Sequence, residues 1–121
     1  MKIKSYKELI VWQKSFELSK VIYGLTKNFP LEEKFGLTSQ MKRSAVSIPS
    51  NIAEGYARKS TKEYINFISI AFGSGAELET QILLAKSLNL APGKELEIAE
   101  ALLEEVMKML NVLLKKIKSI S

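Results

Sequence analysis

The sequence predicts an all-α protein that folds as an antiparallel up-and-down four-helix bundle, with a single domain over residues 1–121. Four segments place apolar residues three or four positions apart, the spacing that keeps one face of an α-helix buried. The breaks between these segments are short, and short connections join antiparallel neighbours in a bundle. We expect helices over residues 6–28, 37–57, 61–88 and 94–119.

The first segment, residues 6–28, carries two adjacent apolar stripes, which consist of Val11, Leu18, Ile22 and Leu25 and of Leu9, Trp12, Phe16 and Tyr23. Two stripes imply burial on more than one side of the helix. We expect Phe16 in the core of the bundle, and Trp12 and Tyr23 at a subunit interface. Pro30 ends the segment, because the residue before a proline is disfavoured in the α region.

The second segment, residues 37–57, contains a proline in its interior. Its buried face is predicted to consist of Leu37, Met41, Ala45, Ile48, Ile52 and Tyr56. Pro49 lacks the N–H that would bond to the carbonyl of Ala45, and its ring crowds that carbonyl, so we expect a kink here. The opposite face is polar and mostly short, and it is either solvated or meets another helix; it carries Gln40, Arg43, Ser47, Ser50 and Glu54.

The motif Ser47–Gly55, SIPSNIAEG, has two interpretations, of which the first is structural. Serine and Asn51 side chains satisfy carbonyls freed by Pro49, and Glu54 pairs across helices. The alternative is a partner-binding surface. The sequence leaves both open.

The third segment, residues 61–88, begins with a capping box, in which the Ser60 hydroxyl accepts from the N–H of Glu63. Its middle contains Gly73 and Gly75. Each glycine costs about 1 kcal/mol relative to alanine in a helix interior. We therefore expect another backbone to come close at this point.

An antiparallel hairpin of the second and third segments sets their register. Counting outward from the turn near Lys59 puts Arg43 level with Glu77, and Ser47 near Ser74. We predict an ion pair between Arg43 and Glu77 that fixes this register.

The fourth segment, residues 94–119, has the most regular apolar stripe, formed by Ala99, Leu103, Val106, Leu110, Leu113, Ile117 and Ile120. Acidic residues lie at its start and lysines at its end, as the helix dipole favours. The charges at both ends of the segment therefore have a structural explanation.

The composition excludes most catalytic and metal chemistry. The chain has no cysteine and no histidine, which removes thiol nucleophiles, histidine bases and ordinary zinc sites. Glu77 and Glu79 are two positions apart on a helix and point about 200 degrees apart. We expect no catalytic residue, no metal site and no cofactor. No secretory signal or membrane-spanning run is visible, so we expect a cytoplasmic protein.

The net charge of +5 lies in the first half of the chain. Residues 1–60 hold 11 Lys or Arg and 5 Glu, whereas residues 61–121 hold 7 Lys and 8 Glu. Such an asymmetry indicates either an anionic partner such as nucleic acid or a solubilising surface.

Five stretches make the chain recognisable: LIVWQKSF (9–16), YGLTKNFP (23–30), FGLTSQMKRSAVSIPSNIAEG (35–55), STKEY (60–64) and AFGSGAELE (71–79). They resemble the bacterial four helix bundle protein family, which includes proteins encoded by intervening sequences in 23S ribosomal RNA genes. The chain is also similar to the accessory variability determinant of diversity-generating retroelements. The resemblance implies a homopentamer that binds structured RNA or other nucleic acid and has no catalytic activity. In the retroelement branch it implies binding to a reverse transcriptase, but no residue places the chain there.

The basic residues are the candidate nucleic-acid contacts, because phosphate affinity arises from several cations acting together. These are Lys42, Arg43, Arg58, Lys59, Lys62, Lys2, Lys4 and Lys7, the last three forming an N-terminal arm. Each also has a structural interpretation: Arg58 pairs with Glu54 one turn earlier, and the remaining lysines are solvated. The alternative function is a protein-interaction scaffold that binds no nucleic acid.

Overall fold

The computed structural model describes residues 4–120, and this part of the chain contains four α-helices and no strand. They are α1 (Ile10–Thr26), α2 (Leu37–Tyr56), α3 (Thr61–Ser87) and α4 (Gly93–Ser119). Short 3₁₀ helices, Tyr6–Glu8 and Leu31–Glu33, precede α1 and α2. All four helices lie where the apolar spacing predicts them. The largest difference is at the start of α1, where the backbone of Leu9 is extended.

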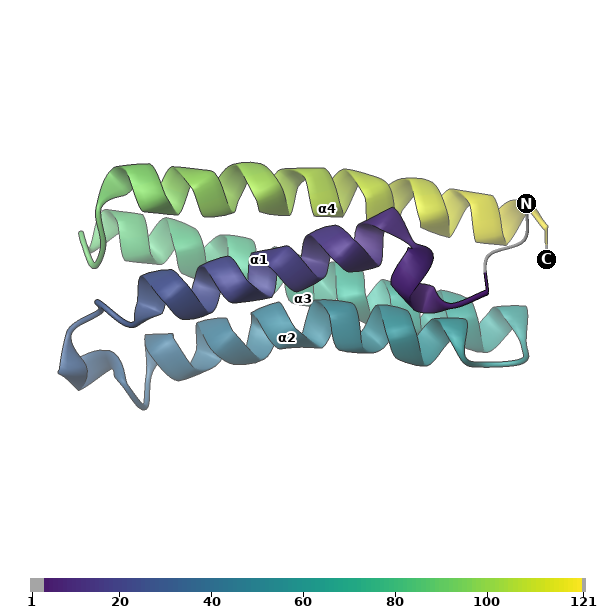
Figure 1. Ribbon diagram of the computed structural model, residues 1–121, viewed down its shortest axis with the longest axis horizontal. Helices are drawn as coiled ribbons and strands as arrows, with labels where there is room; N and C mark the ends of the chain where they lie inside the picture. The colour runs from purple at the N-terminus through teal and green to yellow at the C-terminus, as the bar shows by residue number, and fades with distance from the viewer. Residues whose placement is uncertain (1–3, 121) are drawn as a thin grey trace.

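Consecutive helices run in opposite directions (Figure 1). α1 packs against α2 and α4, and α3 packs against the same two helices from the other side. The chain therefore forms an up-and-down four-helix bundle. The 3₁₀ helix before α1, the end of α4 and the α2–α3 turn lie at one end of the bundle, and the α1–α2 and α3–α4 connections lie at the other (Figure 1).

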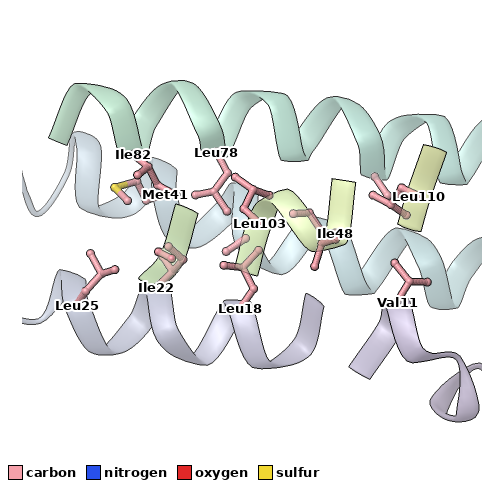
Figure 2. Close-up of a cluster of buried hydrophobic side chains, with 14 of the residues drawn as sticks. Val11, Leu18, Ile22, Leu25, Met41, Ile48, Leu78, Ile82, Leu103 and Leu110 are labelled. Atoms are coloured by element: carbon pink, nitrogen blue, oxygen red, sulfur yellow. The ribbon is translucent and has the colours of Figure 1, made fainter. Parts of the chain in front are cut away.

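All four helices contribute aliphatic side chains to one core (Figure 2). Leu18, Ile48, Leu78 and Leu103 are almost completely buried, and each comes from a different helix. Truncating such a residue to alanine costs about 2–5 kcal/mol, because it leaves a cavity. Phe16, predicted in the core, is instead 45% exposed, since α1 buries only its first stripe fully.

Pro49 lies inside α2, which continues across it as one helix. The carbonyl of Ala45, which the proline leaves without its helical donor, accepts a hydrogen bond from Ser19 Oγ of α1 at 3.0 Å. The same hydroxyl proton is shared with the carbonyl of Ser15, at 3.1 Å. A neighbouring helix therefore replaces the missing bond, and the serine and asparagine side chains of the motif are not needed for this purpose.

The close approach of α2 and α3 occurs at Gly55. A Cβ atom at this position would lie 2.9 Å from Cβ of Phe67, closer than side chains pack. Gly75 is buried against the side chain of Met107, whose sulfur occupies the space that a Cβ would need. Gly73 is exposed and has no atom within 4 Å of its Cβ position. The backbone approach predicted at Gly73 is therefore absent among residues 4–120.

Polar side chains join α2 to α3 in the predicted register. The hydroxyl oxygens of Ser47 and Ser74 lie 2.7 Å apart, and Ser44 Oγ donates to Glu77 Oε1 at 3.1 Å. The predicted ion pair between Arg43 and Glu77 is wrong, because Ser44 is the residue that faces α3, whereas Arg43 lies on the exposed side of α2. Among residues 4–120, Arg43 has no ion-pair partner.

Candidate nucleic-acid interface

Three separate segments bring lysine and arginine residues to one end of the bundle (Figure 1). They are the 3₁₀ helix before α1, the α2–α3 turn and the last turns of α4. We call this surface the basic end; it consists of Lys4, Lys7, Arg58, Lys59, Lys62, Lys115, Lys116 and Lys118. Lys2, a predicted contact, lies outside the described residues. The sequence explains the α4 lysines by the helix dipole alone, because only the fold brings them to the same end of the bundle as the α2–α3 turn.

The basic end carries an excess of positive charge. The carboxylates described there are those of Glu8, Glu54 and Glu63. Glu54 pairs with Arg58 at 2.7 Å within α2, so the predicted pair is present and the expected pairing of Glu54 across helices is wrong. Lys59 and Lys62 are exposed on the surface. The other end of the bundle mixes both signs, with Lys27, Glu32, Glu33, Lys34, Lys86, Lys94, Glu95 and Glu97.

A second surface follows the seam between α1 and α2. Three open hollows of about 600, 290 and 400 Å³ adjoin there, because each shares lining residues with the next. We call them together the aromatic groove; its rings are those of Tyr6, Trp12, Phe16 and Tyr23, and its cations are Lys20, Lys27, Lys42 and Arg43.

Three rings of the aromatic groove lie along α1, and the fourth, Tyr6, comes from the 3₁₀ helix before it. Trp12 and Phe16 are stacked, with centroids 5.1 Å apart and planes 26° apart. Tyr6 meets Trp12 edge-on, with ring centroids 5.4 Å apart. Trp12 is half-buried, whereas Tyr23 is 44% exposed. The second apolar stripe of the sequence therefore marks a surface row.

Two of the groove's four cations lie close to its rings. Lys42 Nζ is 4.9 Å from the ring centroid of Tyr23, and Lys20 Nζ is 5.9 Å from that of Phe16. Of the described residues that line the three hollows, none is acidic. Lys42 and Arg43 are among the contacts predicted from the sequence, whereas Lys20 and Lys27 are not, although they lie on and just after α1 beside its aromatic stripe.

Several residues of the motif Ser47–Gly55 form the floor of the groove and have structural roles there. Pro49 is buried against α1, and Asn51 Nδ2 donates to the carbonyl and the hydroxyl of Ser47, at 2.8 and 2.9 Å. Since Ser47 in turn contacts Ser74, these residues tie α2 to α3 on one side while Pro49 packs on the other. The motif therefore holds α2 in place under the groove.

Two perturbed groups lie outside both surfaces and remain protonated near neutral pH. Burial, with the nearby Tyr56 as a smaller cause, raises the pKa of Tyr64. The hydrogen bond to Glu100, 2.8 Å long, raises the pKa of Lys86. Over residues 4–120, no three potential His, Cys, Asp or Glu ligands gather closely enough to hold a metal ion. None of the described helices is sufficiently long and apolar to span a bilayer.

The family model described as 23S rRNA-intervening sequence protein matches residues 7–112. The chain belongs to this family. The match confirms the resemblance inferred from the sequence motifs. It includes every ring of the aromatic groove except that of Tyr6, and it stops before the α4 lysines of the basic end.

A crystal structure with the same fold is described as a protein with unknown function from the S23 ribosomal protein family, from Bacteroides thetaiotaomicron VPI-5482. This chain is similar to it with 29% sequence identity and a TM-score of 0.82, over 88% of this chain and 99% of that chain. No curated protein matches the chain.

Proposed function

We propose that this family member is a non-enzymatic, homo-oligomeric protein that binds structured RNA or other nucleic acid through its basic end. The observation that carries the proposal is the convergence of cations from three chain segments at one end of the bundle. Phosphate binding requires several cations within one contact area, and each adds to the affinity by releasing counterions. The other end of the bundle carries both signs of charge, so we expect it to bind phosphates more weakly.

The oligomer is the second part of this proposal, with five subunits as the sequence resemblance implies. Large aliphatic side chains remain exposed on the outer side of α3, at Ile70, Leu84 and Leu88. Gly73 lies on the same face by helical spacing and leaves room for a neighbouring backbone. Five copies, each with a net charge of +5, carry about +25 and attract polyanions from a distance.

Binding of a blunt RNA duplex, followed by fluorescence anisotropy over a salt series, tests the nucleic-acid part. The Lys59→Gln/Lys62→Gln variant is expected to bind about 30-fold more weakly near 150 mM salt, because two phosphate contacts are lost. The matched control is Lys34→Gln/Lys94→Gln, which removes the same charge at the other end and leaves the affinity within about twofold. Equal losses in both variants would contradict a localised site.

The alternative candidate is a protein-interaction scaffold, which the exposed rings of Phe16 and Tyr23 and the half-buried ring of Trp12 favour. A subunit or partner protein seated on the groove would bury these rings, as expected for Trp12 and Tyr23. A protein that binds no duplex at about 50 mM salt, yet has a mass in solution that falls when Tyr23 becomes Glu, supports this function instead.

A further inference from the structure

The aromatic groove contains two kinds of side chain that a single simple ligand would not require together. An apolar partner is held by the rings and gains nothing from the flanking lysines. A simple anion is held by the cations and gains little from a row of exposed rings. A chain of aromatic bases joined by phosphates uses both kinds of contact.

We propose that the aromatic groove binds a single-stranded segment of nucleic acid. Unpaired bases stack on the exposed rings of Phe16 and Tyr23, and phosphates lie beside Lys42 and Arg43. This inference rests on the proposed function. It adds a second binding surface and states that this surface selects single strands.

Charge complementarity supports a polyanionic occupant. Cations border the groove from both helices, Lys20 and Lys27 from α1 and Lys42 and Arg43 from α2, while none of the described lining residues is acidic. Arg43 has no ion pair among the described residues, so its guanidinium is available to a phosphate. Lys20 is itself paired with Glu17, at 3.1 Å, and none of the described residues that line the hollow beside Trp12 is charged. An acidic ligand therefore meets its strongest attraction beside Lys42 and Arg43.

The spacing of the rings suits unpaired bases of one strand that are not immediate neighbours. Phe16 and Tyr23 are seven residues apart on α1, which separates them by roughly 10 Å along the helix. Trp12 backs the ring of Phe16, so a base placed on Phe16 extends an existing stack. Bases inside a duplex are already stacked on one another and do not offer their faces, so the groove discriminates against paired strands.

Trp12 provides a direct reporter, because it is the only tryptophan in the chain. The probes are a single-stranded oligouridylate of about 12 nucleotides and a blunt RNA duplex of the same length. The oligouridylate is expected to quench Trp12 fluorescence saturably, because a base joins the stack beside it. The duplex is expected to bind at the basic end and to leave the emission unchanged.

Two variants localise the effect. Phe16→Leu/Tyr23→Leu keeps an apolar surface at two part-exposed positions and removes the rings, so the fold and any apolar interface are retained. Its affinity for the oligouridylate is expected to fall at least about tenfold, since stacking on a ring contributes this much per base. Its affinity for the duplex stays within about twofold of the wild type.

The second variant, Lys42→Gln/Arg43→Gln, changes residues that have no role in the core. It is expected to lower the salt dependence of oligouridylate binding by about two phosphate equivalents. The Lys34→Gln/Lys94→Gln protein is its matched control and is expected to keep the full salt dependence.

Two outcomes overturn the inference while the proposed function stands. In one, the oligouridylate binds equally well to wild type and to Phe16→Leu/Tyr23→Leu without quenching, which places single strands at the basic end. In the other, Trp12 emission depends on protein concentration and is insensitive to RNA, which places a second copy of the chain on the groove. If neither probe binds at about 50 mM salt, both the inference and the proposed function fail.

Discussion

The basic end and the aromatic groove both concentrate positive charge, but they differ in the residues and chain segments that supply it. The basic end takes exposed lysines from three segments that are distant in the sequence. The groove takes its cations from two adjacent helices and places rings between them. Charge alone favours any polyanion, whereas rings between charges favour unpaired bases. The two surfaces are therefore expected to differ in salt dependence and in their preference for single strands.

The salt dependence of duplex binding is the largest expected effect. If the basic end contacts about four to five phosphates, the affinity falls by about two to three decades between 50 and 200 mM salt. Replacing Phe16 and Tyr23 with Leu is expected to leave this slope unchanged, as anisotropy titrations measure. A shallower slope in the groove variant would show that the two surfaces act as one site.

The hydrogen bond from Ser19 to the carbonyl of Ala45 joins α1 to α2 beneath the aromatic groove. It therefore tests the stability of the groove separately from the basic end. Ser19→Ala leaves that buried carbonyl without a donor and is expected to destabilise the protein by about 1–3 kcal/mol in urea unfolding. In a Pro49→Ala background the new N–H reaches the same carbonyl, so the cost of Ser19→Ala is expected to fall. An equal cost in both backgrounds would contradict this role of Ser19.

Substitutions at Gly73 are expected to have different effects on a single chain and on an oligomer. No atom of the described residues lies within 4 Å of its Cβ position, so Gly73→Ala is expected to stabilise the helix by about 1 kcal/mol. If a second subunit approaches there, Gly73→Leu lowers the mass measured by light scattering. An unchanged mass for Gly73→Leu would remove this face from the proposed interface.

Tyr64, packed beside Gly55 close to the basic end, gives the smallest effect. Burial raises its pKa in the folded protein, so the unfolded chain loses this proton first as the pH rises past about 10. Stability is therefore full below pH 10 and falls between the unfolded and the folded pKa. Tyr64→Phe is expected to flatten that part of the stability profile in thermal melts. The Tyr23→Phe variant, whose ring is exposed, is the control and should keep the decline.

The sequence predicts the four helices and their register because helical spacing and turn residues are local signals. The Ser47–Ser74 contact follows from counting along an antiparallel hairpin. The same count chose Arg43 for Glu77 and was wrong, because register does not fix the rotation of a helix by one residue. Phe16 shows why the extent of the core is harder to predict. An apolar stripe beside a buried one has the same pattern in the sequence whether it lies in the core or on the surface.

The two surfaces were only partly predictable. Lysines of the α2–α3 turn and of the N-terminal segment were chosen from charge alone, and the fold adds Lys115, Lys116 and Lys118 to them. The donor for the Ala45 carbonyl was not predictable, because Ser19 is 26 residues away in the sequence. Contacts between helices depend on how the helices face each other, and this information is not local.

Cross-linking tests the central claim of two distinct surfaces most directly. The probe is an RNA with a blunt stem and a single-stranded tail, prepared in two forms that carry photoreactive 4-thiouridine in the stem or in the tail. The cross-linked peptides are identified by mass spectrometry. We expect tail nucleotides on the α1 peptide that holds Phe16 and Tyr23, and stem nucleotides on the α2–α3 turn at Lys59 and Lys62. Tail and stem cross-links on the same turn peptide, with none on α1, would contradict the account.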